Sequence, residues 1–125
     1  MKSDLLLALN DAPTADRLRD YFERRGILVQ TTTSGIECLE KLRSSAPRLL
    51  LLQWELLWGG GDGVLAVMRE EAPPGRTSVL LLANHENAAN LRVVPPVVGC
   101  FATTFDSRRI AGRVSKRFAL TAAGC

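Results

Sequence analysis

Histidine and closely spaced cysteines, the usual ligands of protein-bound zinc, are scarce in this sequence. It has one histidine, which argues against a His-based metal site. Its three cysteines, Cys38, Cys100 and Cys125, are widely spaced, odd in number and without the CxxC spacing of zinc or redox sites. We therefore expect reduced thiols in a cytoplasmic protein, with neither a disulfide framework nor a metal site.

Long apolar runs are also missing. No stretch reaches the roughly 20 apolar residues that a membrane-spanning helix needs. The first apolar run, Leu5 to Leu9, is too short for a secretion signal. The formal net charge of +3 is modest and names no class of partner by itself. With 125 residues, we expect one domain over residues 1–121, followed by a tail or linker over residues 122–125.

The sequence does contain a regular alternation of short apolar runs and amphipathic segments. The four consecutive leucines of Leu49–Leu52 are typical of a central parallel strand that is buried on both faces. The expected strands are Leu5–Leu9, Ile27–Thr33, Leu49–Leu52, Val79–Leu82 and Val97–Thr103. Their alternation with helices predicts a parallel sheet covered on both faces. The expected fold class is α/β, a doubly wound, flavodoxin-like domain with strand order 2-1-3-4-5.

Caps and breakers delimit the expected helices. Pro13 suits the first turn of one helix, and Gly26 is expected to close it as a left-handed cap. Ser34 and Glu37 have the spacing of a capping box. A short helix is expected over Glu86–Val94. Asp106 or Ser107 is expected to cap the last helix. The apolar faces are expected to consist of Ile36, Leu39 and Leu42 in the second helix, Val64, Val67 and Met68 in the third, and Ile110, Val114 and Phe118 in the last.

Ligands of open α/β sheets bind at the carboxyl ends of the strands. The residues expected there are Asn10 and Asp11 after the first strand, Gln53 after the third, Ala83 and Asn84 after the fourth, and Thr103 after the fifth. This order of elements and motifs resembles the CheY-like receiver domain of bacterial two-component response regulators. The resemblance covers nearly the whole chain.

The resemblance implies a phosphorylation site whose working residues have been replaced. In that family the third strand ends in an Asp that accepts a phosphoryl group, and an acidic pair after the first strand holds Mg²⁺. The fourth strand ends in Ser or Thr and the fifth in Lys-Pro. Here the phosphoacceptor position falls on Gln53, whose amide is not a competent nucleophile. The acidic pair becomes Asn10 and Asp11, and the hydroxyl position falls on Ala83. The lysine position falls on Thr103, or on Thr104 if the register slips by one.

These replacements predict a degenerate pseudo-receiver, a signal-transduction domain that works by protein–protein interaction without aspartyl phosphorylation. We expect it to be no enzyme and to need no cofactor. Glu55 is either a displaced metal ligand or substitute acceptor, or a solvated loop carboxylate, which surface preference favours. The Gly59–Gly63 run is either a phosphate-cradling loop or a flexible, longer connection, which the missing P-loop lysine favours. Asp11, Glu55 and this loop define the alternative function, a phosphate- or nucleotide-handling protein.

The last helix is strongly basic, and no acid follows Asp106. Its cations are Arg108, Arg109, Arg113, Lys116 and Arg117. A solvated face is one interpretation. The resemblance implies an output surface of the fourth helix, fifth strand and last helix, near Phe101, for an output domain, an acidic signalling protein or a second copy of the chain. A third function, nucleic-acid association, is disfavoured, because a basic helix without base-reading residues gives only salt-sensitive contact.

Two tryptophans flank the loop after the central strand. At least one of Trp54 and Trp58 is expected to pack in the core, because large aromatic side chains bury most of their area. An exposed one would be a candidate anchor for a partner.

Overall fold

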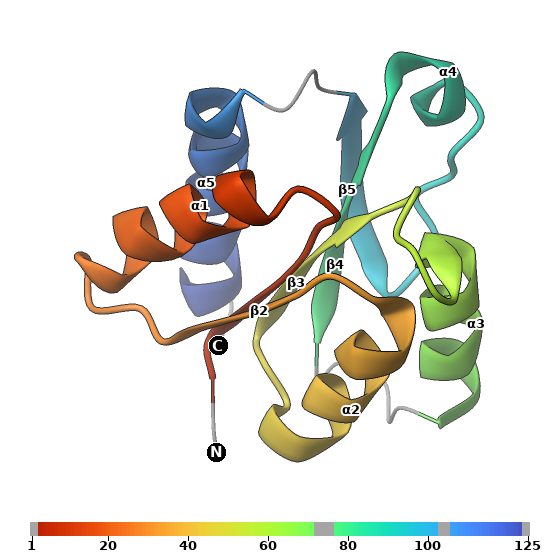
Figure 1. The fold of residues 1–125 in the computed structure, drawn as a ribbon, viewed down its shortest axis with the longest axis horizontal. Helices are drawn as coiled ribbons and strands as arrows, with labels where there is room; N and C mark the ends of the chain where they lie inside the picture. Colours follow the sequence, from red (N-terminus) through yellow and green to blue (C-terminus); the bar gives the residue numbers. More distant parts are fainter. Residues whose placement is uncertain (1–2, 72–76, 103–105, 124–125) are drawn as a thin grey trace.

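The computed structural model of the chain describes residues 3–71, 77–102 and 106–123. Within these ranges, strands and helices alternate along the chain (Figure 1). They are β1 (Leu5–Ala8), α1 (Ala12–Glu23), β2 (Val29–Thr32), α2 (Gly35–Ser45), β3 (Leu49–Gln53), α3 (Gly60–Glu71), β4 (Ser78–Ala83), α4 (His85–Ala88), β5 (Val97–Ala102) and α5 (Ser107–Ala123). Among the described residues, no helix combines the length and the apolar character needed to cross a bilayer. The expected domain boundary at residue 121 stays a prediction.

The strands form one parallel sheet in the order β2-β1-β3-β4-β5, which confirms the predicted fold class. Leu5 of β1 pairs with Val29 of β2 on one side and with Leu49 of β3 on the other. Gln53, the last residue of β3, pairs with Leu82 of β4. Because all strands run in the same direction, their carboxyl ends meet at one edge of the sheet.

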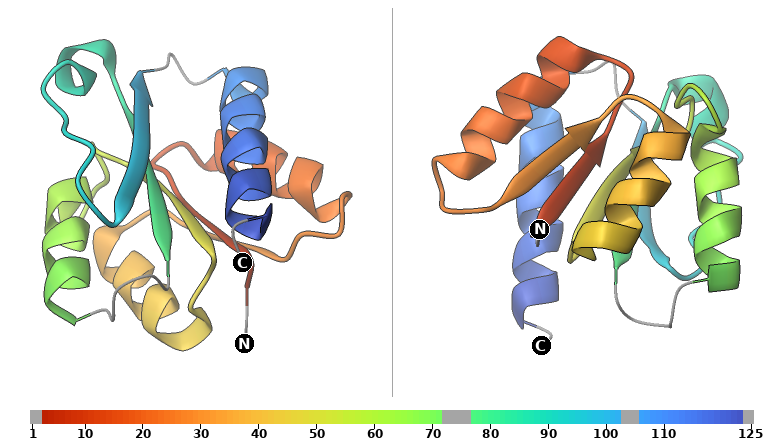
Figure 2. Two further views of the ribbon diagram at one scale, coloured as in Figure 1. Left: turned by 180° about the vertical axis from the view of Figure 1, so that it is seen from behind. Right: turned by 60° about the horizontal axis from the view of Figure 1, so that its bottom comes forward.

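Helices cover both faces of this sheet, which explains why its central strands are apolar on both sides. α1 and α5 pack on one face, and α2 and α3 pack on the other (Figures 1 and 2). Leu5 and Leu7 of β1 belong to the core under α1 and α5, whereas Leu6 and Ala8 belong to the core under α2 and α3. All residues of β3 are buried.

Side-chain caps begin the helices close to where the sequence predicted. Ser34 Oγ accepts a hydrogen bond from the N–H of Glu37 at 3.1 Å and begins α2. Asp106 Oδ1 accepts one from the N–H of Arg108 at 2.9 Å, near the start of α5. Ala46 ends α2 in a left-handed conformation.

The predicted end of the first helix is confirmed, whereas the predicted bounds of the fourth are wrong. After α1, Gly26 has a left-handed conformation with φ of 79°, and the N–H groups of Gly26 and Ile27 donate to the carbonyls of Glu23 and Phe22, so Gly26 closes the helix. α4 is shorter than predicted and begins earlier, at His85. The N–H of Asn90 bonds to the carbonyl of Asn87, a tight turn that ends the helical hydrogen-bonding pattern.

The apolar face predicted for α2 is also partly wrong. Cys38 is fully buried and Leu39 is half-buried, but Ile36 is exposed. A tertiary contact explains this exposure. The N–H groups of Gly35 and Ile36 donate hydrogen bonds to the carbonyls of Leu57 and Trp58 in the β3–α3 loop. The first turn of α2 therefore lies beside that loop, and Ile36 projects to solvent.

Cys38 is chemically inert at neutral pH in this environment. Burial raises the pKa of its thiol to about 12, against a smaller lowering by the nearby Lys41 ammonium. Cys38 and Cys100 form no disulfide among the described residues, and Cys125 lies outside them.

Candidate functional site

The sheet order brings the predicted site residues to one edge. Gln53 ends β3, Ala83 ends β4, and Asn10 and Asp11 follow β1. Ala83 is buried and offers no hydroxyl at the end of its strand. Thr103, which follows β5, lies outside the described residues.

Gln53 is a buried amide with a fixed orientation. Only 5% of the residue is exposed. Its Oε1 accepts a hydrogen bond from the backbone N–H of Asn10 at 2.9 Å, and its Nε2 lies 3.5 Å from Oε1 of Glu55. An amide can accept from one neighbour and donate to the other without carrying charge, which suits a buried position. The position expected to hold a phosphoacceptor thus holds a structural link between β1 and the β3–α3 loop.

Asn10 uses its whole side chain to hold the same loop. Its Nδ2 donates to the carbonyl of Glu55 at 2.7 Å, and its Oδ1 accepts from the N–H of Leu57 at 3.0 Å. Two backbone groups of the loop after Gln53 are therefore satisfied by one asparagine. An aspartate here could accept from Leu57 but could not donate to the carbonyl of Glu55.

Asp11, the carboxylate left at the first strand, caps α1. Its Oδ2 accepts hydrogen bonds from the N–H of Thr14 at 3.1 Å and from the Thr14 hydroxyl. Within the described residues, no cluster of three or more His, Cys, Asp or Glu side chains is placed to hold a metal ion. The carboxylates that could contribute to such a site, Asp11 and Glu55, are each engaged in other contacts.

Glu55 is not the solvated loop carboxylate that surface preference favoured. It is half-buried, and its carboxylate accepts hydrogen bonds from Asn87 Nδ2 at 2.6 Å and from the N–H of Asn84 at 3.3 and 3.4 Å. Asn84 in turn caps α4 by accepting from the N–H of Asn87 at 2.8 Å. The tight turn from Gln53 to Leu56 directs Glu55 toward the end of β4. Asn84 and Asn87 have the spacing of a side-chain helix cap, but no local sequence signal connects them with Glu55.

The Gly59–Gly63 run is bound closely to its neighbours rather than forming an independent flexible connection. A Cβ on Gly61 would lie 2.8 Å from Cα of Trp54, and a Cβ on Gly35 would lie 2.7 Å from the carbonyl oxygen of Trp58. The N–H of Gly61 donates to the carbonyl of Trp54 at 3.0 Å. Because this N–H already has a carbonyl acceptor, it is not available to bind a phosphate. Close backbone packing explains both Gly35 and Gly61.

The two tryptophans have opposite environments, as the sequence allowed. Trp54 is half-buried and packs against the core under α2 and α3, whereas Trp58 is exposed.

The predicted interaction residues lie together on α5 and the neighbouring strand β5. We call Phe101, Arg108, Arg109, Arg113, Lys116 and Arg117 the α5 surface. The guanidinium of Arg113 lies 4.9 Å from the ring centre of the half-buried Phe101. A shallow pocket of about 380 Å³ is lined by Phe101, Ala102, Arg108, Arg109, Gly112 and Arg113. A pocket lined by three arginines, with one guanidinium over an aromatic ring, would suit an acidic partner with an apolar contact.

Comparison by sequence and by structure gave different results. No protein-family model matches the sequence, and no curated protein matches it. Among solved structures, a CheY-like response regulator receiver domain from Methanospirillum hungatei superposes with a TM-score of 0.78 at 15% identity, over 98% of this chain and 99% of that one. Response regulator TrrA from Thermotoga maritima, in complex with Mg²⁺ and BeF, gives a TM-score of 0.71 at 20% identity, over 93% of this chain and 98% of that one.

A third solved structure places the same fold in a longer protein. NtrX from Brucella abortus, in complex with ADP, gives a TM-score of 0.73 at 18% identity, over 99% of this chain but 28% of that one. At such low identities the comparison concerns architecture. The chain has the receiver fold of response regulators, with an amide where β3 ends.

Proposed function

We propose that this chain is a cytoplasmic, receiver-like signalling domain of two-component type that acts by binding protein partners and is not phosphorylated at its central strand. The observation that carries the proposal is the hydrogen-bonded, buried amide of Gln53 at the carboxyl end of β3. An amide nitrogen has its lone pair delocalised and does not attack phosphorus as a carboxylate does.

The neighbours of Gln53 support the same conclusion. The Glu55 carboxylate already accepts from the N–H of Asn84 and from Asn87 at the end of β4. An incoming phosphoryl group would meet this negative charge and would find these donors in use. Ala83 supplies no hydroxyl, and Asp11 is engaged as a helix cap. The proposal therefore gives the chain no catalytic step and no cofactor.

The first test is chemical phosphorylation. After incubation with acetyl phosphate and Mg²⁺, the intact mass of this domain should stay unchanged, because no carboxylate stands at the position of Gln53. TrrA, whose structure holds Mg²⁺ and BeF, is the matched positive control under the same conditions. A phosphoryl group found by peptide mapping on Asp11 or Glu55 would contradict the proposal and support phosphate handling instead.

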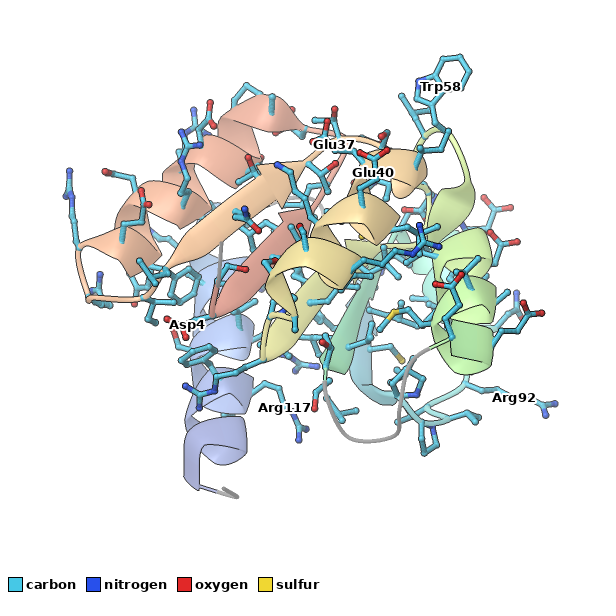
Figure 3. The ribbon with its side chains drawn as sticks, turned by 90° about the horizontal axis from the view of Figure 1, so that it is seen from below. Asp4, Glu37, Glu40, Trp58, Arg92 and Arg117 are labelled. Atoms are coloured by element: carbon cyan, nitrogen blue, oxygen red, sulfur yellow. The ribbon has the colours of Figure 1, made fainter. Side chains whose placement is uncertain are left out.

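The second test concerns the α5 surface. A partner captured from the native cell should bind about tenfold more weakly to the double variant Arg109→Glu, Arg113→Glu, because charge reversal replaces attraction of an acidic surface by repulsion. Arg92→Glu is the control, since Arg92 is exposed far from α5 (Figure 3). Both affinities can be measured by surface plasmon resonance. Equal binding by wild type and double variant would exclude this surface as the interface.

A further inference from the structure

Three large apolar side chains are exposed together on the other face of the molecule from the α5 surface. Ile36 of α2 is 62% exposed, and Leu57 and Trp58 of the β3–α3 loop are 59% and 74% exposed. The two segments are joined by hydrogen bonds from the N–H of Gly35 to the carbonyl of Leu57 at 2.9 Å and from the N–H of Ile36 to the carbonyl of Trp58 at 3.1 Å. The three side chains therefore leave from adjacent backbone positions. We call them the Trp58 patch.

The backbone beneath this patch is held in place. Leu56 is buried, and the N–H of Leu57 donates to Asn10 Oδ1 at 3.0 Å. Trp58 itself has φ of 55°, a left-handed conformation that an aromatic residue rarely adopts. Such strain persists only where surrounding contacts impose it, and it is common at binding sites. The effect here is to hold the indole of Trp58 away from the body of the molecule (Figure 3).

A fixed, exposed tryptophan is suited to binding. Trp offers a large contact area with few rotatable bonds, and a pre-ordered backbone lowers the entropy lost on association. Tryptophans in this setting are among the side chains that most often dominate the energy of an interface.

The charges around the patch indicate the chemistry of the partner. Residues 34–41 and 55–63 contain four acidic residues, Glu37, Glu40, Glu55 and Asp62, and a single basic residue, Lys41. Lys41 Nζ lies 3.5 Å from Glu37 and donates to the carbonyl of Thr31 at 2.7 Å. Glu55 is directed to the end of β4, so that Glu40 and Asp62 carry the excess negative charge. Glu37 and Glu40 lie on α2 beside the loop that carries Trp58 (Figure 3). The patch is thus acidic at its rim, although the whole chain has a net charge of +3.

The α5 surface of a second copy of the chain would fit this patch poorly. The most basic element of the chain is α5, but the apolar residues Ile110 and Val114 of that helix are buried in the core. Phe101 is half-buried beneath Arg113. In its described part, the α5 surface would therefore bring positive charge while Ile110, Val114 and Phe101 are not available to pack on Trp58.

We propose that the Trp58 patch is a second docking site, for a protein segment that carries a large apolar side chain flanked by Lys or Arg. The apolar side chain packs against Trp58, Leu57 and Ile36, and the flanking cations face Glu37, Glu40 and Asp62. The site lies on the α2 and α3 side of the sheet and does not depend on the α5 surface. The chain would then have two surfaces of opposite charge for two different partners.

The test is a selection from a random 16-residue peptide library displayed on phage. The library is first depleted on the variant Trp58→Asn and then selected on the wild-type chain. Asparagine removes the indole but accepts the left-handed conformation, so that the loop keeps its shape. We expect the enriched peptides to combine a large apolar residue with an excess of Lys and Arg. Their affinity, measured by fluorescence polarisation, should fall about 30-fold with Trp58→Asn.

Matched variants separate the competing explanations. Leu28→Asn removes another exposed apolar side chain, 58% exposed and just before β2, and should leave the affinity unchanged. Glu40→Lys should weaken binding a few-fold and reduce its salt dependence. Enriched peptides that are acidic or neutral, or no enrichment at all, would overturn the proposal. The proposal would also be overturned if the peptides failed to bind the double variant Arg109→Glu, Arg113→Glu. It would equally be overturned if the wild-type chain self-associated in sedimentation velocity and the Trp58→Asn variant did not.

Discussion

Gly61→Ala is expected to lower the free energy of unfolding by about 3 kcal/mol. The new methyl group would lie 2.8 Å from Cα of Trp54 and 3.0 Å from the carbonyl oxygen of Gln53, and both are backbone atoms. The backbone cannot rotate away as a flexible side chain does, so the start of α3 and the end of β3 must separate. The loss can be measured as a lower urea midpoint with an unchanged m-value.

Gly63→Ala is the matched control, two residues further along the same helix. A Cβ at Gly63 meets no atom within 4 Å, so the substitution changes only helix propensity and the entropy of the unfolded chain. It should raise the free energy of unfolding by about 0.5–1 kcal/mol. Equal effects of the two substitutions would show that α3 does not pack closely on the end of β3.

Gln53→Glu is expected to lower the free energy of unfolding by about 3 kcal/mol at pH 7, although it changes one atom type and no volume. The new carboxylate would be buried and would lie beside the Glu55 carboxylate, where the amide now lies 3.5 Å from Glu55 Oε1. Burial and like charge both raise the pKa of the new carboxyl in the folded state above its unfolded value. The folded state then binds more protons, so the variant loses stability as the pH rises above about 4.3 and approaches wild type below it.

The double variant Gln53→Glu, Glu55→Gln tests whether the loss comes from the pair. It exchanges the amide and the carboxylate while keeping one charge between them, and it should recover most of the stability of the wild type in a double-mutant cycle. Urea unfolding at pH 4 and pH 7 provides all the values. Should Gln53→Glu unfold like wild type at both pH values, the amide would not be required by its surroundings, and the structural role assigned to Gln53 would be wrong.

Several parts of the fold were predictable because they depend on local residue choice. The leucine run of β3 alternates between two cores, so its lack of polar residues already indicated a strand covered on both faces. Ser34 and Asp106 cap helices through their own side chains, a signal contained within a few residues. Gly26 ends α1 through its left-handed conformation, which is again a signal carried by a single residue.

The candidate site was only partly predictable. The positions of Asn10, Gln53 and Ala83 at one edge of the sheet followed from strand order. The hydrogen bonds of Asn10 to the loop and of Glu55 to Asn84 span more than 25 positions of sequence, and no local pattern reports them. The general preference of glutamate for the surface could not indicate that the Glu55 carboxylate accepts hydrogen bonds from Asn84 and Asn87 at the end of β4.

The sequence by itself determined the alternation of strands and helices, the amide at the end of β3 and the positive charge of α5, because each is a property of residue type and short-range spacing. Only the tertiary structure decided which way Glu55 and Ile36 point and that Trp58 is held exposed on a strained backbone. Those outcomes depend on backbone groups of α2, β4 and the β3–α3 loop coming within hydrogen-bonding distance. These hydrogen bonds join residues far apart in the chain, so that their partners are set by the folded geometry and not by local sequence.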